Sequence, residues 1–135
     1  SEILQGTGFF ELFTYKEQSI QVIMLKVKKG DYLIIPSDYY HLSINTGKDP
    51  FIFGDLIIED ANSEYGHLKE KKGAPVYVME GAQGMPVFNI NEHYQGYEIG
   101  ITQLNAEDVP WDNPVDSIPL YAHFVANPEA FHYLK

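Results

Sequence analysis

The chain has 135 residues, 44 % of them hydrophobic, a length that suits one domain with its own core. Its formal net charge is −10 and all nine basic residues are lysines, which argues against a nucleic-acid partner or an anionic membrane, since both require a basic surface. It has no cysteine, which excludes disulfides, zinc fingers, thiol nucleophiles and iron–sulfur clusters and is consistent with a cytoplasmic location.

The first sixty residues predict short β-strands separated by turns. Gly, Pro and Asp interrupt the apolar runs about every eight to twelve residues, as in antiparallel sandwiches and barrels. The predicted strands are "EILQ" at 2–5, "FFELFTY" at 9–15, "IQVIMLKV" at 20–27, "YLIIP" at 32–36, "HLSIN" at 41–45 and "FIFGDLIIED" at 51–60. The runs "FFELF" at 9–13 and "IQVIMLKV" at 20–27 fit either the core of a barrel or the interface of a dimer.

After Asp60 the chain becomes more polar. "EYGHLKEKK" at 64–72 predicts a helical turn with its lysines in solvent, and "PVYVMEG" and "MPVFNIN" predict a hairpin around "GAQG" at 81–84. The tail is rich in Pro and Asn, and "NPEAFHYL" predicts one helical turn with Asn127 as cap and Pro128 at the first position.

One spacing within the strand region connects Gly30, Pro36, His41 and Asn45 as G-x5-P-x4-H-x3-N. Gly30 turns one strand into the next, and Pro36 ends a strand because it cannot donate a ladder hydrogen bond. His41 then begins the following strand with its ring directed inward. Asn45 lies on the same face of that strand, four residues on.

This spacing resembles the second conserved motif of the cupin superfamily. More narrowly, the stretch from Pro36 to Gly66 is similar to the cupin-type, archaeal-style glucose-6-phosphate isomerases. The matching residues are Pro36, Tyr39, Tyr40, His41, Ser43, Asn45, Gly47, Asp49, Pro50 to Phe53, Asp60, Ala61, Tyr65 and Gly66. The resemblance implies an all-β cupin jelly roll (barrel or sandwich) over residues 1–94, with residues 95–135 as a C-terminal extension packing on it.

The resemblance also implies one divalent metal ion (Fe, Mn, Ni or Zn) and a homodimer. His41 would be the metal ligand from the second motif, and the first motif would supply an H-x-H pair and a glutamate, the expected catalytic base. That glutamate lies seven residues before the glycine that matches Gly6, which places it two positions before Ser1. The sequence therefore leads us to expect that the first metal motif precedes this chain.

The implied reaction interconverts glucose 6-phosphate and fructose 6-phosphate through a cis-enediol, with Tyr65 helping to position this small sugar phosphate. Two departures affect the pocket, because Ile57 and Ser63 stand where the family has a tyrosine and a histidine. They leave open a different sugar phosphate, another cupin chemistry such as an oxygenase, or a non-catalytic sugar-binding protein.

The other four histidines are interpreted as surface or interface residues, because none is paired at H-x-H or H-x3-H spacing. They are His67, His93, His123 and His132.

Overall fold

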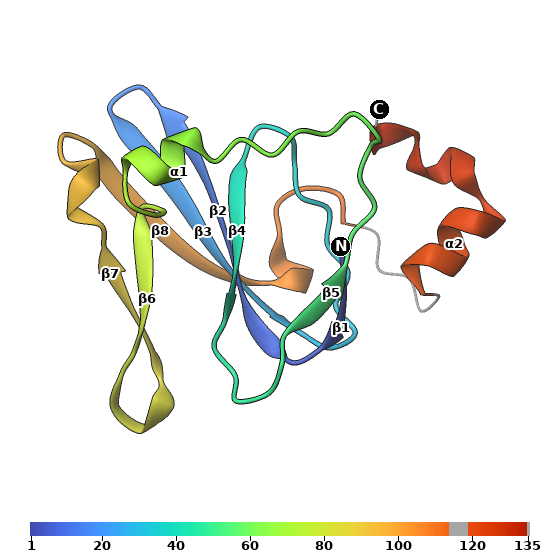
Figure 1. Ribbon diagram of the computed structural model, residues 1–135, viewed down its shortest axis with the longest axis horizontal. Coiled ribbons are helices and arrows are strands. Elements are labelled where there is room, and N and C mark those ends of the chain that lie inside the picture. The colour runs from blue at the N-terminus through green and yellow to red at the C-terminus, as the bar shows by residue number, and fades with distance from the viewer. Residues whose placement is uncertain (114–118, 135) are drawn as a thin grey trace.

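A computed structural model describes residues 1–113 and 119–134, which are mostly β-strands with a few short helices (Figure 1). This confirms the predicted all-β class. The strands are β1 (Glu2–Gln5), β2 (Thr7–Lys16), β3 (Ser19–Lys28), β4 (Tyr40–Asn45), β5 (Ile52–Gly54), β6 (Val76–Glu80), β7 (Pro86–Ile90) and β8 (Glu98–Asn105). Residues 114–118 and 135, part of the predicted extension, lie outside the described residues.

The helices are short. They are α1 (Gly66–Glu70), α2 (Leu120–Ala126) and the 3-10 turns η1 (Ala82–Gly84), η2 (Glu92–Tyr94), η3 (Ala106–Asp108) and η4 (Pro128–Leu134). Within the described ranges, none of the helices has the length and apolar character needed to cross a membrane.

The centre of the molecule is a four-stranded sheet in the order β4–β2–β3–β8. β2 pairs antiparallel with β3 and β4, whereas β8 runs parallel to β3. The inner strands β2 and β3 are covered on both faces, which explains why "FFELF" is a continuous run of buried residues. The apolar runs of β2 and β3 therefore form the core of the chain, and the dimer-interface interpretation of them is wrong.

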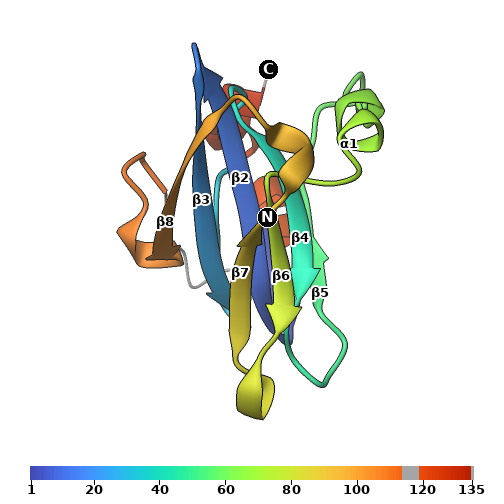
Figure 2. The same ribbon diagram turned by 90° about the vertical axis from the view of Figure 1, so that its left-hand side faces the viewer.

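Alternate residues of β2 and β3 point to two separate layers. The hairpin face of the sheet, which carries Phe9, Phe13 and Met24, packs against the β6–β7 hairpin that stands in front of the sheet in Figure 2. The opposite face of the sheet carries Phe10 and Leu12 and packs against the β1–β5 pair. We call it the cavity face, because it borders the cavity described below.

The predicted strand at 32–36 is wrong, since only Tyr32 forms an isolated bridge, to Glu2. Side chains from later in the chain bind this backbone instead. Trp111 Nε1 donates to the Ile34 carbonyl at 2.9 Å, and Asn113 accepts from the Ile34 N–H at 2.7 Å. These hydrogen bonds replace the ladder of a neighbouring strand.

The long strand predicted at 51–60 is mostly wrong, because only Ile52–Gly54 is a strand. Its partner β1 is short, and Glu2 at its start lies opposite Gly54. Residues 55–60 form no strand in the described chain, and Ile57 is 72 % exposed.

The later elements are predicted in part. The helical turn at 64–72, the 81–84 hairpin and the turn after Asn127 are confirmed as α1, β6–β7 and η4. β8 and α2 were not predicted. The division of the chain near residue 95 stays a prediction, and the strand that follows it joins the central sheet beside β3.

Candidate functional site

A cavity of about 600 Å³ lies on the cavity face of the sheet. It is bordered by His41 of β4, by the irregular segments 32–37 and 55–58, and by side chains of α2 and η4. Most of these residues are apolar, which is typical of a pocket that orients a small ligand with a few polar groups.

His41 reaches this cavity because of its register in the sheet. It lies opposite Leu12 of β2, so its side chain shares the cavity face. Loss of hydration lowers the pKa of His41, and the nearby Asp55 carboxylate acts in the opposite direction. The imidazole is therefore biased toward its neutral form, the form that binds metals.

The rest of the motif shapes the backbone around His41. Gly30 has a φ of +92°, which favours glycine in the turn after β3. Asn45 accepts a hydrogen bond from the Gly47 N–H at 2.9 Å and donates to the Asp49 carbonyl at 3.0 Å. It therefore closes the turn that follows β4, and its side chain is absent from the cavity lining.

Asp55 is the acidic side chain of the lining and accepts a hydrogen bond from the Ser1 hydroxyl. In the two described ranges, no three His, Asp or Glu side chains are placed to hold a metal ion together. His41 thus offers one suitable donor, and these residues alone do not complete a metal site.

The structure separates the other residues that the resemblance singles out. Ile57 lines the cavity, whereas Ser63 and Tyr65 do not. Tyr65 is 58 % exposed and occupies the position before the first residue of α1, where its side chain makes no capping hydrogen bond. Its role in substrate binding stays a prediction.

His67 lies away from the cavity, hydrogen-bonded to Tyr15 and stacked on Tyr40 with ring centroids 5.8 Å apart. It belongs to an aromatic cluster at the end of the sheet. His123 does line the cavity, together with Leu120 of the same helix. Its spacing from Leu120 is typical of one helical face, a signal in the sequence that the assignment of 95–135 to an extension left unused.

Known proteins match the same part of the chain. The model of the family "Glucose-6-phosphate isomerase (GPI)" matches residues 2–95. The glucose-6-phosphate isomerase of Thermococcus onnurineus is 33 % identical over 63 residues, which are 47 % of this chain and 33 % of the relative. That of Thermococcus gammatolerans is 30 % identical over 80 residues, 59 % of this chain and 41 % of the relative.

The glucose-6-phosphate isomerase of Pyrococcus horikoshii is 29 % identical over 86 residues, 64 % of this chain and 44 % of the relative. The matches thus span less than half the length of these curated relatives. No solved structure matches. The family match includes Gly30, His41 and the cavity wall at 55–58, and the chain therefore belongs to the cupin-type glucose-6-phosphate isomerase family.

Proposed function

We propose that the protein containing this chain interconverts glucose 6-phosphate and fructose 6-phosphate in the cytoplasm. The proposal rests on the position of His41. It lies within the region matched by the family and lines the cavity on the cavity face of the sheet. A motif histidine placed on a solvent-facing loop would not support it.

We also propose that His41 supplies one imidazole ligand to a divalent metal ion (Fe, Mn, Ni or Zn). The remaining donors would be the H-x-H pair and the glutamate of the family pattern. Such a metal, when bound, would stabilise the charge that develops on the sugar oxygens. The catalytic base would be the glutamate of the same pattern.

A different sugar phosphate is the second candidate substrate. Ile57 borders the cavity where the family has a tyrosine, so one hydroxyl that could bind substrate is absent. This favours a substrate that needs fewer hydrogen bonds on that side of the pocket.

A homodimer also remains our proposal. Apolar side chains are exposed on two neighbouring elements of the hairpin layer, at Val87 and Ile90 of β7 and Met79 of β6. Sedimentation of the complete protein would give its oligomeric state.

The test uses the complete gene product and a coupled assay for conversion of fructose 6-phosphate to glucose 6-phosphate. We expect turnover that EDTA abolishes, that one of the four metals restores, and that His41→Ala eliminates. His132→Ala is the matched control, because His132 is exposed on η4 and does not line the cavity. Folded protein that is inactive with every metal would reject the isomerase assignment.

A further inference from the structure

One wall of the cavity comes from a part of the chain that the family match does not include. The match ends at residue 95, whereas side chains of α2 and η4 line the cavity, among them Leu120, Phe131 and Tyr133. In Figure 1 these helices lie at the same end of the molecule as β1 and the N-terminus. The family pattern therefore does not say what this wall does.

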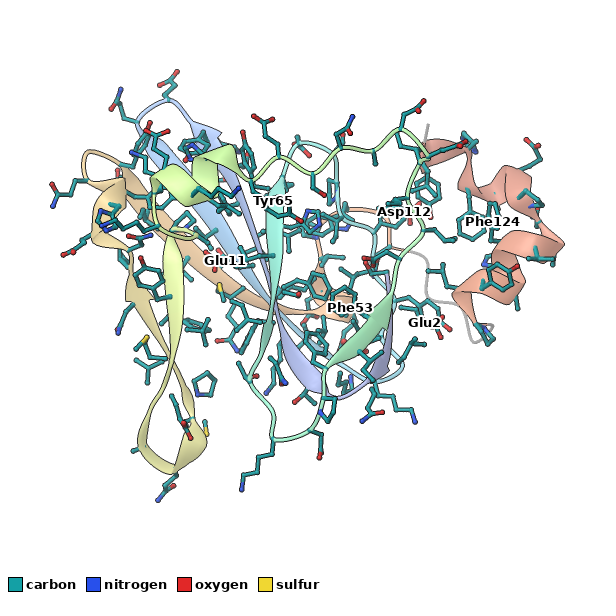
Figure 3. The ribbon with its side chains drawn as sticks, in the orientation of Figure 1. Glu2, Glu11, Phe53, Tyr65, Asp112 and Phe124 are labelled. Carbon is teal, nitrogen blue, oxygen red and sulfur yellow. The ribbon has the colours of Figure 1, made fainter. Side chains whose placement is uncertain are left out.

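Specific contacts hold the wall in place. At the start of α2 the Leu120 N–H donates to Glu2 Oε2 of β1 at 2.8 Å. Phe131 of η4 is only 7 % exposed and packs edge-on against Phe124 of α2, with ring centroids 5.5 Å apart. The ring of Tyr133 lies 6.0 Å from that of Phe131. Figure 3 shows Glu2 and Phe124 at this end of the molecule. Tyr133 is thus carried by an anchored element.

The hydroxyl group of Tyr133 can bind a ligand. The hydroxyls of Ser1 and Tyr32, which also line the cavity, already donate to Asp55 and Glu2. In the described part of the chain no group hydrogen-bonds to the Tyr133 hydroxyl, and Tyr133 is 43 % exposed, so a ligand can reach it. Partial loss of hydration raises the pKa of this phenol, which stays protonated at neutral pH and can both donate and accept.

The charge of the lining limits what the wall can bind. Among the described residues no Lys or Arg lines the cavity, and Asp55 adds negative charge. The lining therefore disfavours a phosphate group, whereas sugar hydroxyls need only neutral donors and acceptors. Ile57 offers no such group on the wall at 55–58, and Tyr133 adds one from η4.

The proposed reaction narrows the part of the sugar that this wall can contact. Isomerisation of a hexose 6-phosphate changes C1 and C2, and these atoms belong near His41 if that residue acts at the reacting end. C6 carries the phosphate. The hydroxyls at C3 and C4 lie between the two ends, and a neutral phenol is suited to bind them.

We propose that the Tyr133 hydroxyl hydrogen-bonds to the C3 or the C4 hydroxyl of the sugar in the His41 cavity, so that η4 helps to determine which sugar is accepted. This inference rests on the proposed isomerase function for its substrate class. It assigns part of the C-terminal segment to the substrate site.

The experiment uses the complete protein and removes one oxygen atom. Tyr133→Phe keeps the ring that packs on Phe131. It should raise the KM for fructose 6-phosphate about threefold to tenfold, the effect of one lost hydrogen bond, with a smaller change in kcat. Tyr121→Phe is the matched control, because Tyr121 is on α2, 72 % exposed and absent from the cavity lining. Its KM should equal that of the wild type.

A second readout identifies the sugar hydroxyl. The 3-deoxy and 4-deoxy analogues of glucose 6-phosphate each lack one of the two candidate groups and serve as competitive inhibitors. The analogue without the bound hydroxyl should inhibit wild type and Tyr133→Phe equally, whereas the other should bind the variant about threefold to tenfold more weakly. An active wild type whose KM is unchanged in Tyr133→Phe, or equal weakening of both analogues, would overturn the inference and leave the isomerase function intact.

An inactive wild type would reject the isomerase function instead. The inference is then decided by NMR of protein labelled with ¹³C at the tyrosine Cζ, in which the Tyr133 signal is the one missing from Tyr133→Phe. A saturable shift of this signal with glucose 6-phosphate that is absent with inorganic phosphate supports the inference. No shift, or the same shift with inorganic phosphate, overturns it.

Discussion

The two faces of the central sheet place an ionisable side chain in opposite environments. On the hairpin face, Glu11 of β2 is fully buried under β6, and its Oε1 accepts from the Val76 N–H at 2.9 Å. On the cavity face, His41 of the adjacent strand borders a solvent-connected cavity. Figure 3 shows Glu11 on the side of the sheet that faces β6 and Phe53 on the β5 side.

The comparison separates stability from ligand binding. In the described structure no group donates to Glu11 Oε2, and burial raises the pKa of this carboxyl to about 7. A layer this tightly packed has no room for a ligand. An ionised Glu11 carboxylate buried in it would lower the stability of the fold. The cavity face keeps the polar side chains of His41 and Asp55 accessible to a ligand. The hairpin face should therefore govern folding, and the cavity face should govern function.

The largest expected effect is the loss of a core aromatic side chain on the hairpin face. Phe9 is 2 % exposed and packs edge-on against Phe88 of β7. Phe9→Ala should lower the free energy of unfolding by about 3–5 kcal/mol, whereas His41→Ala should change it by less than about 1 kcal/mol. Urea denaturation measures both. Equal losses would contradict the division between the two faces.

Ionisation of Glu11 gives the second prediction. Its pKa is raised from 4.5 to about 7 in the folded protein, so the folded state holds this proton more tightly than the unfolded chain. Its effect on stability is absent below pH 4.5 and develops as a loss of about 3 kcal/mol as the pH rises past 7. Glu11→Gln keeps the acceptor for Val76 and should remove this pH-dependent loss.

The measurement is the free energy of unfolding from pH 4 to 9 for wild type and variant. Glu80→Gln is the control, because Glu80 is exposed at the end of β6 on the same hairpin. Parallel pH profiles for wild type and Glu11→Gln would show that water reaches Glu11, and the hairpin face would then be less closed than we infer.

The third prediction concerns the tail that supports the cavity face. Asn113 donates to the Tyr32 carbonyl at 2.8 Å and accepts from the Ile34 N–H at 2.7 Å. Asn113→Ala should cost about 2 kcal/mol, because it leaves these backbone groups without their partner. Hydrogen exchange at Ile34 should accelerate. Asn62→Ala, at an exposed site beside the same cavity, is the control and should leave Ile34 protected.

The sequence correctly predicts a strand where the local apolar pattern is matched by a partner strand nearby in the chain. The run 20–27 became a strand because both its faces are apolar and its partner strand β2 precedes it by one tight turn. The run 32–36 has the same local character and failed, because the backbone hydrogen bonds of Ile34 come from Trp111 and Asn113, more than seventy residues later. No local pattern contains that information.

The candidate site was predictable to the same extent. Motif spacing predicted His41 and its inward orientation, since both follow from the turn and the strand around it. It did not predict His123, which lines the cavity from α2, a helix whose first backbone N–H donates to Glu2. It also missed Glu11, since one acidic residue in an apolar strand is normally assigned to the solvent side of a sheet.

The last prediction has the smallest expected effect and concerns the pKa of His41 on the cavity face. In metal-free protein the pKa of His41 should lie below its ordinary value of 6.5, because partial loss of hydration at the cavity wall disfavours the imidazolium. The unfolded chain then binds the proton more readily, so the contribution of His41 to stability is present above pH 6.5 and declines as the pH falls.

Asp55→Asn removes the carboxylate that opposes this shift and should lower the His41 pKa further. NMR titration of the His41 ring protons measures both values. An unchanged pKa in Asp55→Asn would mean that solvent separates the two side chains, and the cavity would then be too wet for Asp55 to influence a ligand held by His41.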